Sequence, residues 1–377
     1  MNTDNLSALA VGVAVVALIA GFAVYFNSPD LNKGASGQQP EFVSSVDEKG
    51  VIAHIDKSQY KLAPELTRVS GYINSEPFQL KDLRGKVVVV DFWTYSCINC
   101  IRTIPYLNSW YEKYADDGLV IVGVHTPEFD FEKNPDNVKA AVEKFGIKYP
   151  VVQDNDKGTW QEYQNRYWPR KYIVDDEGYI RYDHIGEGGY AESENVIQSL
   201  LKERAANLGS DISIDSQSTA PQDVQSVDFG KIHTPELYFG YAFARAQLGN
   251  SEVFRPDQVV TYSIEDKDLK PNAIYLSGQW KNNPDHMELQ GPAGRIELQY
   301  SAKSVNIVAG GTGKIFVSED DSALTEESLG RDLLEDGSAT IDGQRLYNIV
   351  SHSAYGDHHL VINVAGEGFQ IYTFTFG

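Results

Sequence analysis

The sequence predicts an α/β domain with a mixed sheet and helices on both faces, followed by an all-β sandwich and preceded by a single transmembrane helix. Three observations support this architecture. Buried β-branched runs alternate with helical spacing between residues 86 and 204. Short strand-like runs separated by Gly, Asn and Asp turns fill the last third of the chain. One long apolar run lies close to the N-terminus.

The apolar run extends from Leu6 to Phe26 without a charged residue. At about 1.5 Å per residue, a helix of this length covers the roughly 30 Å hydrocarbon core of a bilayer. The preceding residues include no Lys or Arg, and the run ends in bulky side chains, so we expect an uncleaved anchor. The small residues Ala20, Gly21 and Ala23 leave a cleaved signal peptide as the alternative.

We expect five segments along the chain. They are the anchor at 1–27, a tether and lead-in at 28–66, the α/β domain at 67–206, a polar linker at 207–230 and the β-sandwich at 231–377.

Within the α/β domain, β-branched runs predict strands, and apolar residues spaced three or four apart predict helices. The segment Ser75–Gly85 is expected to form a short strand and a turn. The predicted strands that follow are Val87–Trp93, Leu119–Val124, Tyr149–Val152, Arg170–Val174 and Tyr179–Tyr182, the last two joined by a hairpin turn. The predicted helices are Ile98–Tyr114, Asn134–Phe145, Gly158–Tyr167 and Ser193–Arg204.

In the C-terminal region, alternation of apolar and polar residues predicts strands of an all-β sandwich. The predicted runs are Ile296–Tyr300, Ser304–Val308, Lys314–Ser318, Arg345–Val350, Leu360–Val364 and Gln370–Gly377.

The chain is acidic, with a formal net charge of −21, and 42% of its residues are hydrophobic. The hydrophobic content is that of an ordinary globular protein. The charge argues against nucleic acid or an anionic membrane surface as the main partner, because both would repel the protein.

The only two cysteines, Cys97 and Cys100, are separated by two residues. A disulfide scaffold would need more cysteines at wider spacing, and a zinc site would need two further ligands nearby. A redox-active dithiol is therefore the remaining interpretation. A chain without any other thiol suits an oxidising, extracytoplasmic location.

The dithiol is expected where a buried strand leads into a helix. Cys97 would lie at the N-terminus of that helix, where free N–H groups and the helix dipole favour a thiolate. Cys100 would lie one turn further on, shielded from solvent and placed to resolve a mixed disulfide formed on Cys97.

These residues resemble a known family. The stretch Asp91–Cys100 resembles the active-site segment of thioredoxin-like proteins. Six further segments resemble the soluble region of DipZ-type cytochrome c biogenesis proteins, and more broadly the TlpA-like thiol–disulfide oxidoreductases. They are Ile101–Pro105, Gly123–Glu128, Asn165–Pro169, Thr234–Ala242, Gly310–Gly313 and Phe374–Gly377. The resemblance covers about residues 70–377 and implies a thioredoxin fold followed by a carbohydrate-binding-module-like domain. We expect a single anchor in this chain where DipZ-type proteins have a multi-span electron-importing domain.

The resemblance also implies individual roles. Asp91 corresponds to the buried carboxylate that relays a proton to or from Cys100; the alternative is a strand-end carboxylate that only caps or pairs. Pro169 corresponds to the cis-proline that faces the dithiol; the alternative is an ordinary trans proline. The other residues expected around the dithiol are Trp93, Ser96, Ile98, Asn99, Trp168, His125 and Glu128. His125 and Glu128 would tune the thiols or bind substrate, or would be ordinary loop residues.

Two groups in the β-region have weaker signals. His352, His358 and His359 bound an expected turn; they allow a metal site, but solvated loop histidines are commoner, so we expect no metal and no cofactor besides the dithiol. Tyr275, Trp280 and Tyr300 would form an aromatic platform for a carbohydrate ligand, or would be core residues.

The sequence thus predicts a membrane-anchored, extracytoplasmic thiol–disulfide oxidoreductase that reduces protein disulfides, with a role in cytochrome c maturation. Its electrons would come from a separate membrane thiol donor, such as a CcdA-like protein. A peroxiredoxin-like peroxidase is one alternative, because Thr94 and Cys97 fit a T-x-x-C pattern, although Val90 replaces the expected proline. The other alternative is a surface binding protein whose C-terminal domain recognises a ligand.

Overall fold

The computed structural model describes residues 56–377 except 211–212, 223, 244–247, 253 and 266–268. The predicted anchor at Leu6–Phe26 lies outside the described residues. Among the helices of the described part, none is both long enough and apolar enough to cross a membrane.

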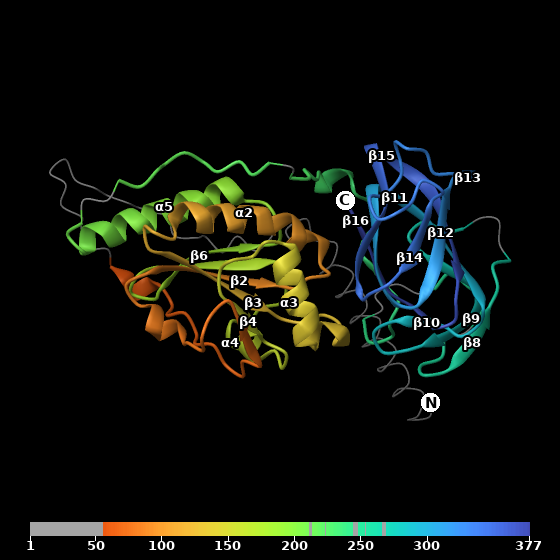
Figure 1. The fold of residues 1–377 in the computed structure, drawn as a ribbon, viewed down its shortest axis with the longest axis horizontal. Coiled ribbons are helices and arrows are strands. Elements are labelled where there is room, and N and C mark those ends of the chain that lie inside the picture. Colours follow the sequence, from red (N-terminus) through yellow and green to blue (C-terminus); the bar gives the residue numbers. More distant parts are fainter. Residues whose placement is uncertain (1–55, 211–212, 223, 244–247, 253, 266–268) are drawn as a thin grey trace, which may run out of the picture. The chain divides into compact units, whose positions relative to one another are not determined.

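The first domain is built on a mixed six-stranded sheet in the order β1-β4-β3-β2-β5-β6 (Figure 1). Its strands are β1 (Gly71–Ile73), β2 (Val87–Trp93), β3 (Leu119–His125), β4 (Val151–Gln153), β5 (Arg170–Val174) and β6 (Ile180–Ile185). The central strands β2, β3 and β4 are parallel, and β5 runs antiparallel to β2. This arrangement confirms the predicted mixed sheet of a thioredoxin-like fold.

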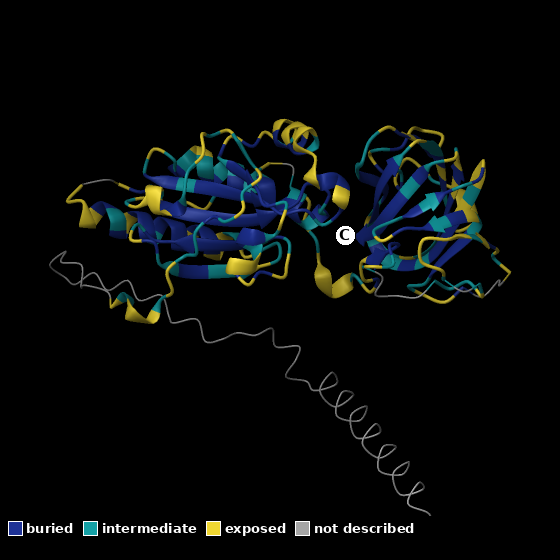
Figure 2. Cartoon of the chain, turned by 90° about the horizontal axis from the view of Figure 1, so that it is seen from below, coloured by how far each residue is buried: buried dark blue, intermediate teal, exposed yellow. Residues whose placement is uncertain are grey.

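Four α-helices belong to this domain: α2 (Ile98–Tyr114), α3 (Pro135–Lys144), α4 (Gly158–Glu162) and α5 (Tyr190–Asn207). Alternate residues of β2 enter two different cores. Val87, Val89 and Trp93 lie on the face of the sheet that packs against α2, α3 and α5. Val88, Val90 and Phe92 lie on the opposite face, which α4 covers. Burial of both faces explains the unbroken apolar run, and Figure 2 shows these strands as almost wholly buried.

Three predicted elements of this domain need correction. Residues 75–79 form no strand, and they are followed by the 3₁₀ helix η3 (Leu80–Leu83). The backbone N–H of Gln79 donates a hydrogen bond to the Asp82 carboxylate at 2.9 Å, which stabilises the start of η3. Helix α4 ends five residues earlier than predicted, because Gln164 adopts a left-handed conformation. Helix α5 is longer than predicted at both ends.

Three further 3₁₀ helices lie at η2 (Lys57–Gln59), η4 (Asp130–Lys133) and η5 (Phe229–Lys231). Part of the segment between α5 and η5, predicted to be a polar linker, is hydrogen-bonded to the first domain. Ile214 is buried, and Thr219 donates its N–H to the Glu194 carboxylate on α5 at 2.7 Å. Ile214 and Thr219 therefore hold this part of the linker against the first domain.

The second domain is all-β, as predicted. Its strands are β7 (Leu237–Tyr238), β8 (Val259–Tyr262), β9 (Ile274–Asn282), β10 (Met287–Leu289), β11 (Ala293–Gly311), β12 (Gly313–Glu319), β13 (Ser322–Ala323), β14 (Ser338–Ile341), β15 (Arg345–Ala365) and β16 (Phe369–Phe376). Hydrogen bonds join them into one ten-stranded sheet. Apolar residues from β8 and β9 at one end and from β12 and β14 near the other share one core, so the sheet folds over on itself.

The structure corrects two predictions about this domain. Two pairs of predicted strands are each one continuous strand. The predicted strands Ile296–Tyr300 and Ser304–Val308 both belong to β11. The predicted strands Arg345–Val350 and Leu360–Val364 both belong to β15. The expected turn around His352–His359 is therefore an irregular part of β15. Of the two alternatives for Tyr275, Trp280 and Tyr300, the structure favours core residues over a sugar platform, because each side chain is at most 4% exposed.

Candidate functional site

The dithiol lies at the junction of β2 and α2. Cys97 is the N-cap of α2, and its Sγ accepts a bond from the backbone N–H of Cys100 at 3.4 Å. Cys97 is half-buried, whereas Cys100 is 1% exposed. Burial is the main cause that raises the pKa of the Cys100 thiol well above its usual value. One thiol is therefore accessible to a partner, and the other is enclosed.

Asp91 is buried on the α2 side of β2. It is 2% exposed, and burial raises its pKa to about 7, an effect that the charge of Lys171 partly offsets. Its Oδ1 has no hydrogen-bond partner among the described residues. The carboxylate is close enough to Cys100 to raise the pKa of that thiol. A proton can thus reside on Asp91 near neutral pH, next to the buried thiol.

Lys171, which the sequence reasoning missed, lies directly across from Asp91 in the β2–β5 pairing. Its side chain is fully buried, and burial lowers its pKa. A lysine within the otherwise apolar strand β5 was the available signal, but only the register shows that it faces Asp91.

Glu132, also missed, holds the loop that precedes the dithiol. Its Oε1 accepts bonds from the Ser96 hydroxyl at 2.6 Å and the Ser96 N–H at 3.3 Å. Its Oε2 accepts bonds from the N–H groups of Glu128 at 2.6 Å and Phe129 at 3.0 Å. The carboxylate is fully buried. It lies in an acidic run, FDFEK, that resembles solvated surface, so sequence offered no signal.

The Trp168–Pro169 peptide bond is cis, as the resemblance implied. Pro169 is buried, and its carbonyl accepts the N–H of Gly186 at 2.8 Å. The Trp168 indole donates to the carbonyl of Thr126 at 3.0 Å and packs against Trp160. These contacts fix the shape of the proline loop.

His125 is enclosed by aromatic rings. Its imidazole stacks on Tyr95 with 5.7 Å between ring centroids and meets the edge of Trp93 at 5.2 Å. It is fully buried, and burial lowers its pKa to about 3, so the ring is neutral at physiological pH. Of the two interpretations of His125, the structure favours a packed residue over one that binds substrate. Trp93 is likewise buried.

Glu128 is bonded to a residue of the second domain. Its Oε1 accepts the hydroxyl of Tyr238 on β7 at 2.7 Å. Burial and the neighbouring carboxylates of Glu236 and Glu132 raise the pKa of Glu128 to about 8. Tyr238 is near enough to Cys97 for that thiol to influence its pKa. The β-domain therefore contributes to the surroundings of the accessible cysteine.

The remaining predicted surroundings are structural. Ile98 is buried in the core cluster that contains Cys100. The Asn99 side chain accepts a bond from Arg102 at 2.6 Å, and Arg102 also pairs with Glu187 at 2.7 Å. These contacts hold the first turn of α2.

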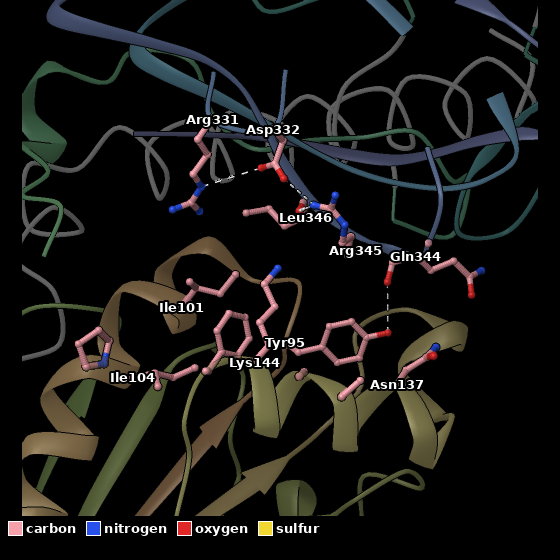
Figure 3. Close-up of a pocket in the computed structure, with 15 residues that line it drawn as sticks. Tyr95, Ile101, Ile104, Asn137, Lys144, Arg331, Asp332, Gln344, Arg345 and Leu346 are labelled. Carbon is pink, nitrogen blue, oxygen red and sulfur yellow. Dashed lines mark hydrogen bonds and ion pairs between the residues drawn. The ribbon is translucent and has the colours of Figure 1, made fainter. Parts of the chain in front are cut away.

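A cavity of about 650 Å³ lies along α2 beyond the dithiol (Figure 3). Ile101 and Ile104 of α2 line it together with Lys144, Arg345 and other residues from both domains. The Tyr95 hydroxyl at its edge reaches the Gln344 carbonyl at 3.5 Å. Neither Cys97 nor Cys100 is among the residues that line this cavity.

Comparison with known proteins supports this description. Residues 61–183 match the model of the AhpC/TSA family, and residues 234–377 match that of the thioredoxin-like C-terminal domain. Protein DipZ of Mycobacterium tuberculosis is 36% identical over 318 residues, which are 84% of this chain and 43% of DipZ. The chain thus spans less than half the length of that relative. The predicted resemblance to DipZ-type proteins is confirmed.

Shorter relatives match a little more than a third of the chain. The thiol–disulfide oxidoreductase YkuV of Bacillus subtilis is 29% identical over 140 residues, 37% of this chain and 94% of YkuV. A solved structure of a thiol–disulfide isomerase from Corynebacterium glutamicum is 28% identical and has a TM-score of 0.34, covering 37% of this chain and 96% of its own.

Proposed function

We propose that this protein is a thiol–disulfide oxidoreductase that reduces protein disulfides through Cys97 and Cys100. One observation carries the proposal: an accessible cysteine at a helix N-terminus stands one turn before a buried cysteine, which lies next to a carboxylate with an unpaired oxygen. The relatives named as thiol–disulfide oxidoreductases support the same activity.

The first step uses Cys97. Its thiolate attacks one sulfur of the substrate disulfide, the substrate S–S bond breaks, and a mixed disulfide forms while the other substrate sulfur leaves and takes a proton. The N-terminus of α2 favours the thiolate that this step consumes. Pro169 and the backbone beside it would align an extended substrate segment against Cys97.

The second step uses Cys100 and Asp91. Asp91 accepts the proton of the Cys100 thiol, and the resulting thiolate attacks Sγ of Cys97. The mixed disulfide breaks, the reduced substrate leaves, and a Cys97–Cys100 disulfide remains. Two electrons have passed to the substrate, so an external dithiol must reduce the protein again.

The proposed setting is the extracytoplasmic side of a membrane, with the protein tethered through Leu6–Phe26. The electron donor would be a membrane thiol protein of the CcdA-like kind, and the substrates would include the disulfide of an apocytochrome c. The similarity to DipZ supports this setting.

Two measurements test the proposal. The reduction potential of the dithiol should lie near that of thioredoxin, about −270 mV, whereas a value near −120 mV would make the protein an oxidant. In cells, the Cys100→Ala variant should accumulate mixed disulfides on Cys97 whose partners identify donor and substrate. The Cys97→Ala, Cys100→Ala double variant is the control and should trap nothing.

A peroxidase is the second candidate, because residues 61–183 match the AhpC/TSA family model. A peroxidase that uses only Cys97 for the attack on peroxide would keep consuming it after Cys100→Ser, with an external thiol as reductant. We expect that variant to lose disulfide reduction and to show no peroxide turnover; sustained turnover would favour the peroxidase.

A further inference from the structure

Two histidines and a glutamate meet in the β-domain, far along the chain from the dithiol. Glu319 ends β12, and both His352 and His358 belong to β15. One ligand atom from each of the three side chains lies within 4.8 Å of the others. The His352 Nε2 is 2.7 Å and the His358 Nδ1 is 3.9 Å from the same oxygen, Oε2 of Glu319.

An irregularity in β15 creates this meeting. Ser351 pairs with Ser304, but Gly356 pairs with Ala302, so residues 352–355 lie opposite Lys303 alone. In an uninterrupted strand, residues six positions apart would be about 20 Å apart. Here the rings of His352 and His358 are nearly parallel, with 4.3 Å between their centroids. The bulge thus places both imidazoles against one carboxylate.

The carboxylate is held by a second layer of contacts. Glu319 is 7% exposed, and its Oε1 accepts the hydroxyl of the buried Tyr300, which leaves Oε2 directed at the histidines. The Tyr300 ring also lies 5.7 Å from that of His358. Hydrogen-bonded outer residues of this kind orient ligands in metal sites and raise their affinity.

The surroundings favour a cation and provide access for it. The Asp320 carboxylate lies 2.8 Å from the His358 Nδ1. Asp320 and Asp357 line a cavity next to the cluster. That cavity has a volume of about 550 Å³, and His358 lines it. Negative side chains around an open hollow attract a divalent ion, and the hollow has room for a water ligand.

We propose that Glu319, His352 and His358 form a Zn²⁺ site, with the fourth position filled by water or by Asp320. Two imidazoles and one carboxylate suit zinc, which takes nitrogen and oxygen ligands in tetrahedral geometry. Calcium and magnesium prefer oxygen ligands alone. The ion would tie the bulge of β15 to the end of β12. The site is independent of the thiol chemistry proposed above.

Zinc binding to the full-length protein tests the proposal, with the dithiol oxidised so that no thiolate competes. Equilibrium dialysis should find one Zn²⁺ per chain. Co²⁺ as a spectroscopic probe should give visible absorption without sulfur-to-cobalt charge-transfer bands. His352→Ala and His358→Ala should each weaken zinc binding at least tenfold.

His359→Ala is the matched control. This neighbouring histidine lines the same cavity, but its Nε2 bonds Glu297 at 2.9 Å and it is outside the cluster. Zinc binding by His359→Ala should remain as in the parent protein.

Tyr300→Phe should weaken zinc binding at least tenfold while keeping one ion per chain, because only the outer contact is lost.

Folding is checked by thermal unfolding in EDTA, where each variant should melt cooperatively. Added zinc should raise the melting temperature of the parent protein and of His359→Ala, but not of His352→Ala or His358→Ala. The proposal is overturned if no stoichiometric zinc binds, if His359→Ala weakens binding as much as the other two histidine variants, or if calcium displaces zinc at equal concentration.

Discussion

Two carboxylates are buried next to the dithiol loop, and they differ in how their oxygens are satisfied. Glu132 accepts hydrogen bonds from N–H or O–H donors at both oxygens, at least two at each. Asp91 has an oxygen without any partner among the described residues. The pKa of each is raised by burial. Burial alone therefore does not distinguish a structural acid from one that exchanges a proton.

The difference between Asp91 and Glu132 supports the proton-exchanging role proposed for Asp91 and a structural role for Glu132. An oxygen that already accepts two bonds has no capacity to take a proton without losing a contact, so Glu132 serves to hold Ser96 and the Phe129 loop. An unpaired oxygen in a dry site gains by protonation, and Asp91 has this oxygen beside Cys100. Three substitutions test this comparison.

The largest effect is expected from Asp91→Asn. The amide cannot accept the Cys100 proton, so release of the mixed disulfide should slow about 100-fold at pH 8, as expected for loss of a general base. In the parent protein this rate should rise with pH through about 7, where Asp91 ionises, and the variant should lack that rise. Stopped-flow release of a fluorescent mixed-disulfide substrate measures it.

The same substitution has an effect on stability with a defined sign. The pKa of Asp91 is raised from 3.8 to about 7 in the folded protein, so folding is favoured by the protonated form. The parent protein should lose stability as pH rises from about 4 through about 7, and Asp91→Asn should flatten that part of the urea-unfolding profile. Asp116→Asn, which replaces an exposed aspartate after the end of α2, is the control. An unchanged pH profile in Asp91→Asn would contradict the assignment.

Glu132→Gln should act on stability instead. The glutamine side chain has only one acceptor oxygen. The donors that face the other oxygen of Glu132 in the parent protein would lose their acceptor and face an NH₂ group instead. We expect a loss of about 2 kcal/mol in the free energy of unfolding, measured in urea. Glu112→Gln replaces an exposed glutamate of α2 and should change little. Equal stability of the two variants would show that the Glu132 contacts are not structural.

The smallest effect is expected from Lys171→Met. The positive charge of Lys171 lowers the pKa of Asp91, so its removal should move the midpoint of the pH–rate profile upward by about one pH unit. Lys139→Met, on the exposed side of α3, should leave the midpoint in place. A downward movement in Lys171→Met would show that the lysine does not stabilise the Asp91 carboxylate.

Local sequence patterns were sufficient to predict the central strand β2 and the helix α2 of the first domain. The predicted bounds of β2 and α2 agree with the structure, because a strand buried on both faces and an amphipathic helix each have a distinct period. The predictions failed where the outcome depended on other contacts. The turn at Leu80–Leu83 depends on side-chain capping, and the long strands β11 and β15 continue through polar residues because neighbouring strands keep them paired.

The sequence by itself determined the dithiol, its position between a strand and a helix, and Asp91 six residues before Cys97, since these features are close together along the chain. Only the tertiary structure brought Lys171, Glu132 and Tyr238 to the same place. Each is more than 30 residues away from the dithiol and is positioned by sheet register or by packing between domains. The same holds for Glu319 and the two histidines of β15, since a strand bulge decides whether they meet.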